Sequence, residues 1–389
     1  MKALPLPQGW KEFKLKDILA NEKYSMKRGP FGSSLKKEFF VKEGIKVFEQ
    51  YNPINNDPYW CRYRITKEKY NELSAFKCKA GDFLVSCSGT LGKIILLPDD
   101  VEEGIINQAL LKIKLNNNII DNKYFLNLFQ SKIFQDKIYS DARGGAIQNV
   151  ASIDEIKLIH FILPPLDEQK RIAEVLSLCD DVIENLTKLI EKKELYKKGV
   201  MQRVLSGEVR FKGFKDEWQT VRLGDILSYE QPNNYIVKSD EYNDRYECPV
   251  LTAGKTFILG YTDEKIGIYN KLPVIIFDDF TTETKYVNFP FKVKSSAIKI
   301  LSSNKYNLKL IYELIKMIKF NAEAHKRYWI SEYQYLEIKI PKSIEEQQKI
   351  AGLLSVIDEE IDNLKKQLEL RKQQKKGLMQ RLLTGEVRI

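Results

Sequence analysis

The sequence predicts a mixed α/β (α+β) protein with two domains, each followed by a long helix, arranged as an internal repeat. The first observation is a near-duplication: KKGVMQRVLSGEVRF at 197–211 returns as KKGLMQRLLTGEVRI at 375–389. The second is that the regions preceding these helices combine short strand-like runs with Gly-containing turns. The third is length, because 389 residues exceed what one ordinary core accommodates.

The repeat extends beyond the two closing motifs and sets the expected domain boundaries. Between 166–211 and 344–389 roughly half of the positions are identical, and no gap is needed, which indicates a duplicated structural unit. A weaker repeat precedes each helix, where GWKEFKLKDIL at 9–19 resembles EWQTVRLGDIL at 217–227. We therefore expect a first domain, a central helix, a second domain and a C-terminal helix at 1–165, 166–208, 209–342 and 343–389.

Both repeated helices carry recognisable start and stop signals. The second follows Ser343-x-x-Glu346, a capping box, and the first has Asp167 as its expected N-cap residue. Gly207 and Gly385 stand where a C′ glycine ends a helix. Each helix is therefore expected to run for about 36–40 residues, or roughly 54–60 Å.

Apolar residues in both helices recur with the heptad spacing of a coiled-coil seam. The expected seam residues are Ile172, Leu176, Cys179, Ile183, Leu186, Ile190, Ile350, Leu354, Ile357, Ile361, Leu364 and Leu368. Lys193, Lys197, Arg371 and Lys375 interrupt the two seams at matching points. Because a buried lysine is costly unless it is paired, we expect a looser seam or another partner there.

Composition favours a globular protein with an anionic partner. The formal charge is +10, and the most common partner of such a basic chain is nucleic acid. No stretch approaches the roughly 18 apolar residues of a membrane helix, and MKALPLPQGW lacks the apolar run of a signal peptide. The five cysteines form no C-x-x-C pair, so we expect reduced core cysteines in a cytoplasmic protein without membrane contact.

The sequence contains no recognisable catalytic or metal-binding constellation. GTLGK at 89–93 lacks the spacing and the hydroxyl of a phosphate loop. Glu283-Thr-Lys285 is too close to the preceding aspartates for a restriction-type nuclease motif. The two histidines, His160 and His325, are too few for a histidine-rich metal site. We therefore expect no catalytic residues and no metal ligands.

Several loops join Gly, Ser or Thr with Lys, Arg, Gln or Asn, the residue types that contact phosphates and base edges. Examples are KRGPFGSSLKK at 27–37, SCSGTLGK at 86–93 and HKRYW at 325–329. The candidate DNA-binding residues are Lys36, Lys37, Ser88, Thr90, Lys93, Arg143, Gln148, Asn149, Lys255, Lys285, Lys326, Arg327 and Tyr328. The alternative interpretation of each loop is an ordinary surface turn with solvated charges.

The repeated motifs resemble the specificity subunits of type I restriction–modification enzymes. The residues that carry this resemblance are LPPLDEQKRIAEVLS and IPKSIEEQQKIAGLLS, which open the helices, and the two closing motifs. AGDFLVSCSGTLGK at 80–93 and FGSSLKKEFF at 31–40 resemble the variable domains of the family. The second domain departs from that pattern, because LPVIIFDDFTTETK at 272–285 stands in place of the first motif.

The resemblance implies two α/β target recognition domains, joined and spaced by two long antiparallel coiled-coil helices with pseudo-twofold symmetry. Each domain would read one half of a bipartite site in double-stranded DNA. The helix faces outside the apolar seam, including Tyr196, would dock modification (methyltransferase) subunits, two of them, beside restriction/translocase subunits. S-adenosylmethionine, ATP and Mg²⁺ are expected only on those partners, and this chain is expected to bind no cofactor and to be no enzyme.

Two alternative functions are compatible with the same pattern. One is a coiled-coil protein-interaction scaffold whose variable regions bind proteins. The other is a specificity subunit of another multisubunit restriction–modification type. Salt-sensitive DNA binding would separate the first alternative from a DNA-reading subunit, because phosphate contacts make affinity depend on salt.

Overall fold

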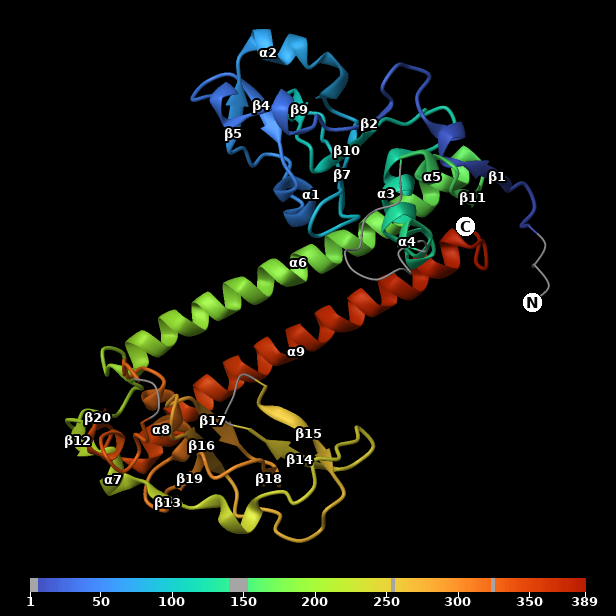
Figure 1. Ribbon diagram of the computed structural model, residues 1–389. Coiled ribbons are helices and arrows are strands. Elements are labelled where there is room, and N and C mark those ends of the chain that lie inside the picture. The colour runs from blue at the N-terminus through green and yellow to red at the C-terminus, as the bar shows by residue number, and fades with distance from the viewer. Residues whose placement is uncertain (1–5, 140–152, 253–255, 323–325) are drawn as a thin grey trace. The chain divides into compact units, whose positions relative to one another are not determined.

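The computed structural model describes residues 6–139, 153–252, 256–322 and 326–389, and the chain divides into two compact units. The first unit comprises Met1–Thr187 with Gln367–Ile389, and the second comprises Lys188–Lys366. Two long helices, α6 (Leu166–Leu205) and α9 (Ile344–Leu383), each contribute one half to either unit (Figure 1). The mixed α/β class expected from the sequence is confirmed.

The first unit holds three sheets in its described residues. Their strand orders are β2-β10-β7-β8, β3-β5-β4-β9-β6 and β1-β11. The strands are β1 (Lys11–Lys14), β2 (Met26–Arg28), β3 (Phe40–Val41), β4 (Ile45–Phe48), β5 (Tyr63–Ile65), β6 (Lys77–Cys78), β7 (Phe83–Ser86), β8 (Ile94–Leu96), β9 (Gly104–Ile106), β10 (Leu110–Ile113) and β11 (His160–Leu163). The helices are α1 (Tyr51–Asn55), α2 (Lys67–Glu72), α3 (Asn122–Gln130), α4 (Lys132–Tyr139) and α5 (Ile153–Lys157), with short 3-10 helices η1 (Leu15–Ile18), η2 (Gly32–Ser34), η3 (Lys37–Phe39) and η4 (Ser74–Phe76).

The second unit also holds three sheets in its described residues, with the orders β13-β19-β16-β17, β15-β14-β18 and β12-β20. The strands are β12 (Gln219–Arg222), β13 (Ser228–Glu230), β14 (Cys248–Leu251), β15 (Ile258–Thr262), β16 (Val274–Asp278), β17 (Thr284–Val287), β18 (Lys292–Val293), β19 (Ile298–Ser302) and β20 (Glu337–Ile340). The helices are α7 (Leu223–Ile226) and α8 (Leu308–Ile315), with 3-10 helices η5 (Pro232–Tyr235) and η6 (Tyr333–Tyr335).

The weaker repeat in the sequence corresponds to a shared sheet topology. The four-stranded sheets β2-β10-β7-β8 and β13-β19-β16-β17 match strand for strand in order along the chain. In each unit the first strand pairs antiparallel with the strand that precedes a long helix, Lys11 with Leu163 and Gln219 with Ile340. The segment 272–285 therefore supplies β16 at the place of β7, although its sequence motif differs.

The long helices are equal in length, 40 residues each. Because α6 begins at Leu166, Asp167 lies in its first turn and is not the N-cap. At α9, Ser343 Oγ accepts a hydrogen bond from Glu346 N–H at 3.3 Å, but the Glu346 carboxylate binds elsewhere, so the capping box is only half formed. After each helix a glycine takes a positive φ, 77° at Gly207 and 72° at Gly385, the conformation in which glycine costs least.

Within each unit the halves of α6 and α9 run antiparallel where they contact each other (Figure 1). In the first unit Glu168 contacts Arg388, and Asp180 contacts Lys375, so later residues of α6 meet earlier residues of the other segment. In the second unit Lys193 pairs with Glu360 at 2.7 Å. The paired cations include Lys193 and Lys375, which interrupt the apolar seams in the sequence.

None of the twelve expected seam residues is exposed. The buried ones are Ile172, Leu176, Ile190, Ile350, Leu354, Ile357 and Ile361, and the half-buried ones are Cys179, Ile183, Leu186, Leu364 and Leu368. In the first unit Ile172 and Leu176 join the main core together with Leu382 of α9. In the second unit Ile350 and Leu354 join a core that contains Leu205 of α6. The helices therefore belong to the hydrophobic cores of both units.

Candidate nucleic-acid interface

One end of the four-stranded sheet in the first unit gathers polar and basic residues from three segments. Strand β2 ends at Arg28, and β10 begins just after Gln108. The loop between β7 and β8 runs from Ser86 to Lys93. Because β10 pairs antiparallel with both β2 and β7, these three loops meet at the same end of the sheet. We call this end, formed by residues 28–37, 86–93 and 107–109, the first strand-end surface.

The β7–β8 loop has a fixed backbone. Ser86 N–H donates to Lys93 O at 2.8 Å, and Ser86 Oγ accepts from Lys93 N–H at 3.0 Å. Cys87 N–H donates to Ala109 O at 2.7 Å, which ties the loop to the start of β10. Ser88 is half-buried, and Thr90 and Lys93 are exposed. The loop therefore offers one hydroxyl and one ammonium group to solvent from a supported position.

The β2–η2 segment lies beside this loop and is anchored through Gly29. Gly29 N–H donates to Leu110 O at 2.9 Å, and a Cβ at this position would stand 1.8 Å from Asn107 O. Only glycine permits so close an approach of two backbones. Lys36 and Lys37 are exposed at the far end of the segment, and Lys36 lies 3.8 Å from the Glu38 carboxylate.

Burial raises the pKa of two acidic side chains of the first unit, one of which lies in the first strand-end surface. Burial raises the pKa of the Glu49 carboxyl, and burial raises the pKa of the Cys87 thiol to about 11. A cavity of about 570 Å³ lies next to the loop, lined in part by Asn56, Lys93 and Gln130. Amide and ammonium groups of this kind donate hydrogen bonds to phosphates and base edges.

The second unit places a shorter turn at the corresponding end of its sheet. Asp278 N–H donates to Glu283 O at 2.8 Å and Asp279 N–H donates to Ala297 O at 2.9 Å, matching the bonds of Ser86 and Cys87. Thr282, with a φ of 60°, closes the turn, and Lys285 is exposed on β17. We call residues 278–285 and 326–327 the second strand-end surface.

A buried aspartate attaches the 326–329 segment to this turn. Asp279 Oδ1 accepts the N–H groups of Tyr328 at 3.1 Å and Trp329 at 2.8 Å. The other carboxylate oxygen lies 3.3 Å from Lys299 Nζ, and both side chains are almost wholly buried. The Arg327 guanidinium stands over the Phe280 ring at 5.5 Å from its centroid.

The structure corrects one of the thirteen candidate DNA contacts. Tyr328 is 2% exposed and packs edge-on against Phe320 in the core, so it cannot reach DNA without unfolding the segment. Lys326 is exposed and forms an ion pair with Glu332. Arg143, Gln148, Asn149 and Lys255 lie outside the described residues. The other candidates lie in the two strand-end surfaces.

Three residues of the first strand-end surface were not among the sequence candidates: Arg28, Phe31 and Gln108. Arg28 Nε donates to Gln108 O at 3.5 Å, which links β2 to the loop before β10. Arg28 and Phe31 lie inside the basic loop at 27–37, so the sequence pattern of that loop could have identified both residues. Nothing in the sequence near Gln108 distinguishes it, because its position depends on the pairing of β10 with β2.

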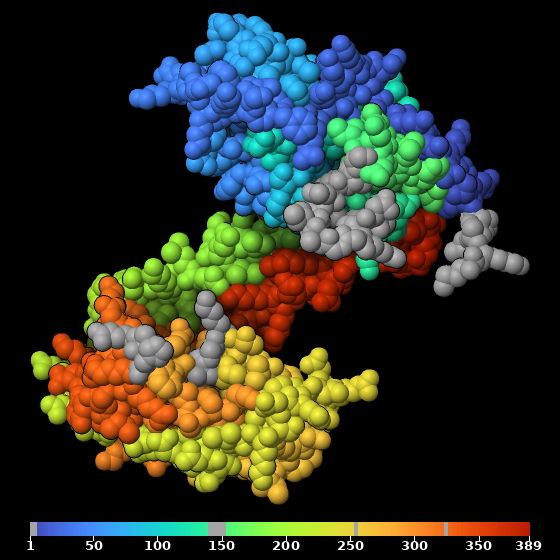
Figure 2. Space-filling view, viewed as in Figure 1, coloured from blue at the N-terminus to red at the C-terminus, as the bar shows by residue number. Residues whose placement is uncertain are grey.

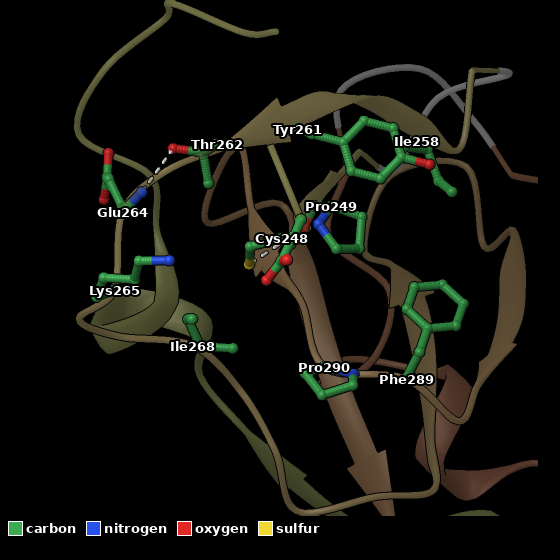
Figure 3. A pocket seen from close by; sticks show the side chains of 11 residues that line it. Cys248, Pro249, Ile258, Tyr261, Thr262, Glu264, Lys265, Ile268, Phe289 and Pro290 are labelled. Carbon is green, nitrogen blue, oxygen red and sulfur yellow. Dashed lines mark hydrogen bonds between the residues drawn. The ribbon is translucent and has the colours of Figure 1, made fainter. Parts of the chain in front are cut away.

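A separate cavity of about 590 Å³ opens in the second unit beside β14 and β15 (Figure 3). Figure 3 shows Pro249, Tyr261 and Phe289 around it, with Glu264 and Lys265 on the turn that follows β15. Burial raises the pKa of the Cys248 thiol in its wall, which disfavours the reactive thiolate.

Neither a metal centre nor a membrane span is found in the described part of the chain. Across residues 6–139, 153–252, 256–322 and 326–389, no three His, Cys, Asp or Glu side chains are grouped to hold a metal ion. No helix in those ranges combines the length and the apolar character that crossing a bilayer requires.

Comparison with known proteins assigns the family. The sequence profile described as "Type I restriction modification DNA specificity domain" matches residues 7–195 and 215–372, most of the chain. The chain belongs to the family of type I restriction–modification DNA specificity domains. The two matched segments of this specificity-domain protein contain the α/β regions of the first and second unit, respectively. The internal repeat is therefore a repeat of the family's own domain.

Relatives of this specificity-domain protein are specificity subunits by name. It is 46% identical over 191 residues to the type I restriction enzyme EcoR124I/EcoR124II specificity subunit of Escherichia coli, a match covering 45% of this chain and 47% of the relative. The chain thus spans about half the length of that relative. It is 26% identical over 326 residues to the MjaVIII specificity subunit of Methanocaldococcus jannaschii, covering 74% of this chain and 75% of the relative.

A solved structure shares the fold of the specificity-domain protein. The type I restriction–modification system S subunit from M. genitalium matches with a TM-score of 0.65 at 19% identity, over 98% of each chain. Sequence similarity is therefore weak while the fold is retained.

Proposed function

We propose that the chain is the DNA-reading subunit of a type I restriction–modification enzyme and that each unit binds one half of a bipartite duplex site. The observation that carries the proposal is that the family's DNA specificity domain occurs twice, each time with a strand-end surface of loops. The first surface displays Lys36, Lys37 and Lys93, and the second displays Lys285 and Arg327. Cations of this kind contact phosphates, and neighbouring hydroxyl and amide groups contact bases.

Two reading units give more discrimination than one. A single unit covers few base pairs, and each mismatched pair costs about 1–3 kcal/mol in binding. When two half-sites face the same side of a duplex, their centres are separated by about one helical turn, or about 10 bp. We propose that the rigid helices α6 and α9 set this spacing. Within each unit, an ion pair and a shared core join the segments of α6 and α9, which supports a structural role for both helices.

The long helices also offer surface for partner subunits. Figure 2 shows α6 in green and α9 in red at the molecular surface. Leu178, Leu195 and Tyr196 on α6, and Val356 and Leu370 on α9, are large apolar side chains that are exposed. Large apolar side chains on an accessible surface are suited to protein contacts. We propose that these faces bind two modification (methyltransferase) subunits, which associate with restriction/translocase subunits.

The chemistry is assigned to those partners. S-adenosylmethionine would bind the modification subunits, and ATP and Mg²⁺ would bind the restriction/translocase subunits. The whole assembly would act in the bacterial cytoplasm, where its DNA lies.

The decisive experiment is methylome sequencing of a host with and without this gene, together with footprinting of the complex with its modification subunits. The expected result is methylation and protection of two short half-sites separated by a spacer that is not read. Replacing residues 219–340 with the corresponding region of a relative should change one half-site and leave the other intact. One uninterrupted site, or a change in both half-sites on this replacement, would contradict the proposal.

A further inference from the structure

Phe31 is an aromatic residue held out into solvent at the first strand-end surface. Its side chain is 76% exposed, although a phenyl ring of this size is normally buried. The preceding residues Gly29 and Pro30 are buried, so the ring stands at the tip of a segment whose base lies in the protein. Single exposed apolar residues are common on protein surfaces, so exposure alone does not assign a function to Phe31. The residues around it must be considered as well.

The segment that carries Phe31 is supported on both sides. Before it, Gly29 N–H is bonded to Leu110 O, and the Gly29 backbone contacts Asn107 O. After it, Ser34 N–H donates to Phe31 O at 2.9 Å and begins the η2 turn. The backbone that carries the ring is thus held by two hydrogen bonds, one to the sheet and one within the η2 turn.

The groups around Phe31 are those that enter a DNA groove. Arg28 precedes it by three residues, and Arg28 Nε contacts Gln108 O. The Gln108 side chain lies 3.8 Å from where a Cβ of Gly32 would be. Lys36 and Lys37 follow on the same segment. Proteins that kink DNA combine an apolar wedge with Arg, Lys, Asn or Gln in this way.

We propose that Phe31 inserts between two base pairs of the half-site bound by the first unit and opens that base step. The inference rests on the proposed function. Insertion removes the phenyl ring from water and stacks it on a base, so that part of the cost of unstacking is offset. The opened step then contributes to specificity, because flexible steps unstack more readily than stiff ones.

The second unit lacks the same arrangement among its described residues. The aromatic residue at its strand-end surface is Phe280, which is 37% exposed and lies beneath the Arg327 guanidinium. A ring covered by a cation is not free to enter a base stack. Opening of a base step is therefore assigned to one half-site only.

The test uses the chain in complex with its modification subunits on a duplex that carries the methylated site. 2-Aminopurine, whose fluorescence rises when it is unstacked, replaces the bases of the first unit's half-site one at a time. The expected result for the native complex is a rise at one step that is distinct from the methylated adenine. Phe31→Ala should abolish this rise and lower affinity by about tenfold. Phe31→Trp should retain it.

Leu158→Ala serves as the matched control, because Leu158 is an exposed apolar residue of the same unit outside the strand-end surface. It should leave the fluorescence rise and the affinity unchanged. The signal at the methylated adenine reports extrusion by the modification subunit and should persist in Phe31→Ala.

Three outcomes would overturn the inference, and they separate it from the proposed function. If the native complex protects a bipartite site but no fluorescence rise depends on Phe31, insertion is wrong and DNA reading stands. If Phe31→Ala loses modification subunits while the rise remains, Phe31 contacts a protein partner. If no bipartite site is bound at all, the proposed function fails together with the inference.

Discussion

Arg388 and Glu168 form a two-pronged ion pair in the first unit, with Nη2 and Nε of the guanidinium at 2.7 and 3.0 Å from the two carboxylate oxygens. The second unit contains the equivalent pair, Arg210 with Glu346, at 2.8 and 2.9 Å. In each unit the closing motif of one helix therefore binds the opening motif of the other. The near-identity of the two motifs follows from these matching contacts.

The glutamines beside these glutamates have matching contacts as well. Gln169 Oε1 accepts Asp121 N–H, and Gln347 Oε1 accepts Asn307 N–H, both at 2.9 Å. Each accepted N–H belongs to the N-cap residue of a helix in the α/β region, α3 or α8. The Glu-Gln pair thus joins a long helix both to the N-cap of a helix in the α/β region and to the segment that follows the other long helix.

We predict that Arg388→Ala destabilises the first unit more than its surface position suggests. Glu168 is only 4% exposed, and a buried carboxylate that loses its partner is left uncompensated. Calorimetry should show a lower unfolding temperature for the first unit, and Arg388→Lys should restore only part of it because lysine cannot form both bonds.

A double-mutant cycle tests the same pair quantitatively. Combining Arg388→Ala with Glu168→Gln should destabilise less than the two single changes added together, because the second change removes the unpaired charge. Arg210→Ala is the matched control and should act on the second unit. Additive effects of the two substitutions would show that the pair is not coupled.

We predict acid sensitivity from the same contact. The hydrogen bonds from Arg388 hold the pKa of the Glu168 carboxyl below its ordinary value. The unfolded carboxyl titrates near pH 4.3, so the stabilisation is fully present above that pH and is lost as pH falls toward the lowered folded pKa. Urea midpoints from pH 7 to pH 3 should fall below about pH 4.

Glu168→Gln should flatten that fall, since glutamine does not titrate. The change will not remove all acid sensitivity, because the hydrogen bonds from Arg64 also lower the pKa of Glu102. Identical pH profiles for the native chain and the Gln variant would refute the prediction.

We predict that Leu382→Ala lowers the free energy of unfolding by about 2–5 kcal/mol. Leu382 is fully buried in the first core, beside Ile172 and Leu176, and its loss would leave a cavity between the two helices. Leu370→Ala on the same helix removes an exposed side chain and should change stability by less than about 0.5 kcal/mol. Denaturant unfolding of both variants measures the difference.

We predict that Lys93→Ala weakens DNA binding without changing the preferred sequence. An exposed ammonium at the β7–β8 loop suits a phosphate contact, and losing one such contact lowers the salt slope of log K by about 0.9. Lys67→Ala, on α2, is the matched control and should leave the slope unchanged. A relaxed preference at one base pair would instead assign Lys93 to a base.

The long helices could be predicted because their pattern is local. Ile350, Leu354, Ile357 and Ile361 recur at helical spacing within twelve residues, and all four are buried. The helix ends at Gly207 and Gly385 could also be predicted, because the residue after a helix often takes a positive φ, which favours glycine. Because the helix sequence occurs twice, each of these patterns appears at two places in the chain.

The strand-end surfaces could not be predicted, because they depend on pairing between distant segments. Arg28 and Ser88 are brought to the same end of a sheet only because β10 lies between β2 and β7. Tyr328 was wrongly placed at DNA for the same reason. Its basic neighbours are visible in the sequence, whereas the bond from its N–H to Asp279, 49 residues earlier, is not.

The first unit is built from two separate segments of the chain, and this has a consequence for its synthesis. Its core includes Leu382 and Leu383, while the intervening Lys188–Lys366 belongs to the second unit. At about 5–20 residues per second, a ribosome takes about 10–35 s to synthesise that intervening stretch. The unit that begins first is thus completed last. During that interval the first core lacks Leu382 and Leu383, so the apolar residues that pack against them stay exposed to water.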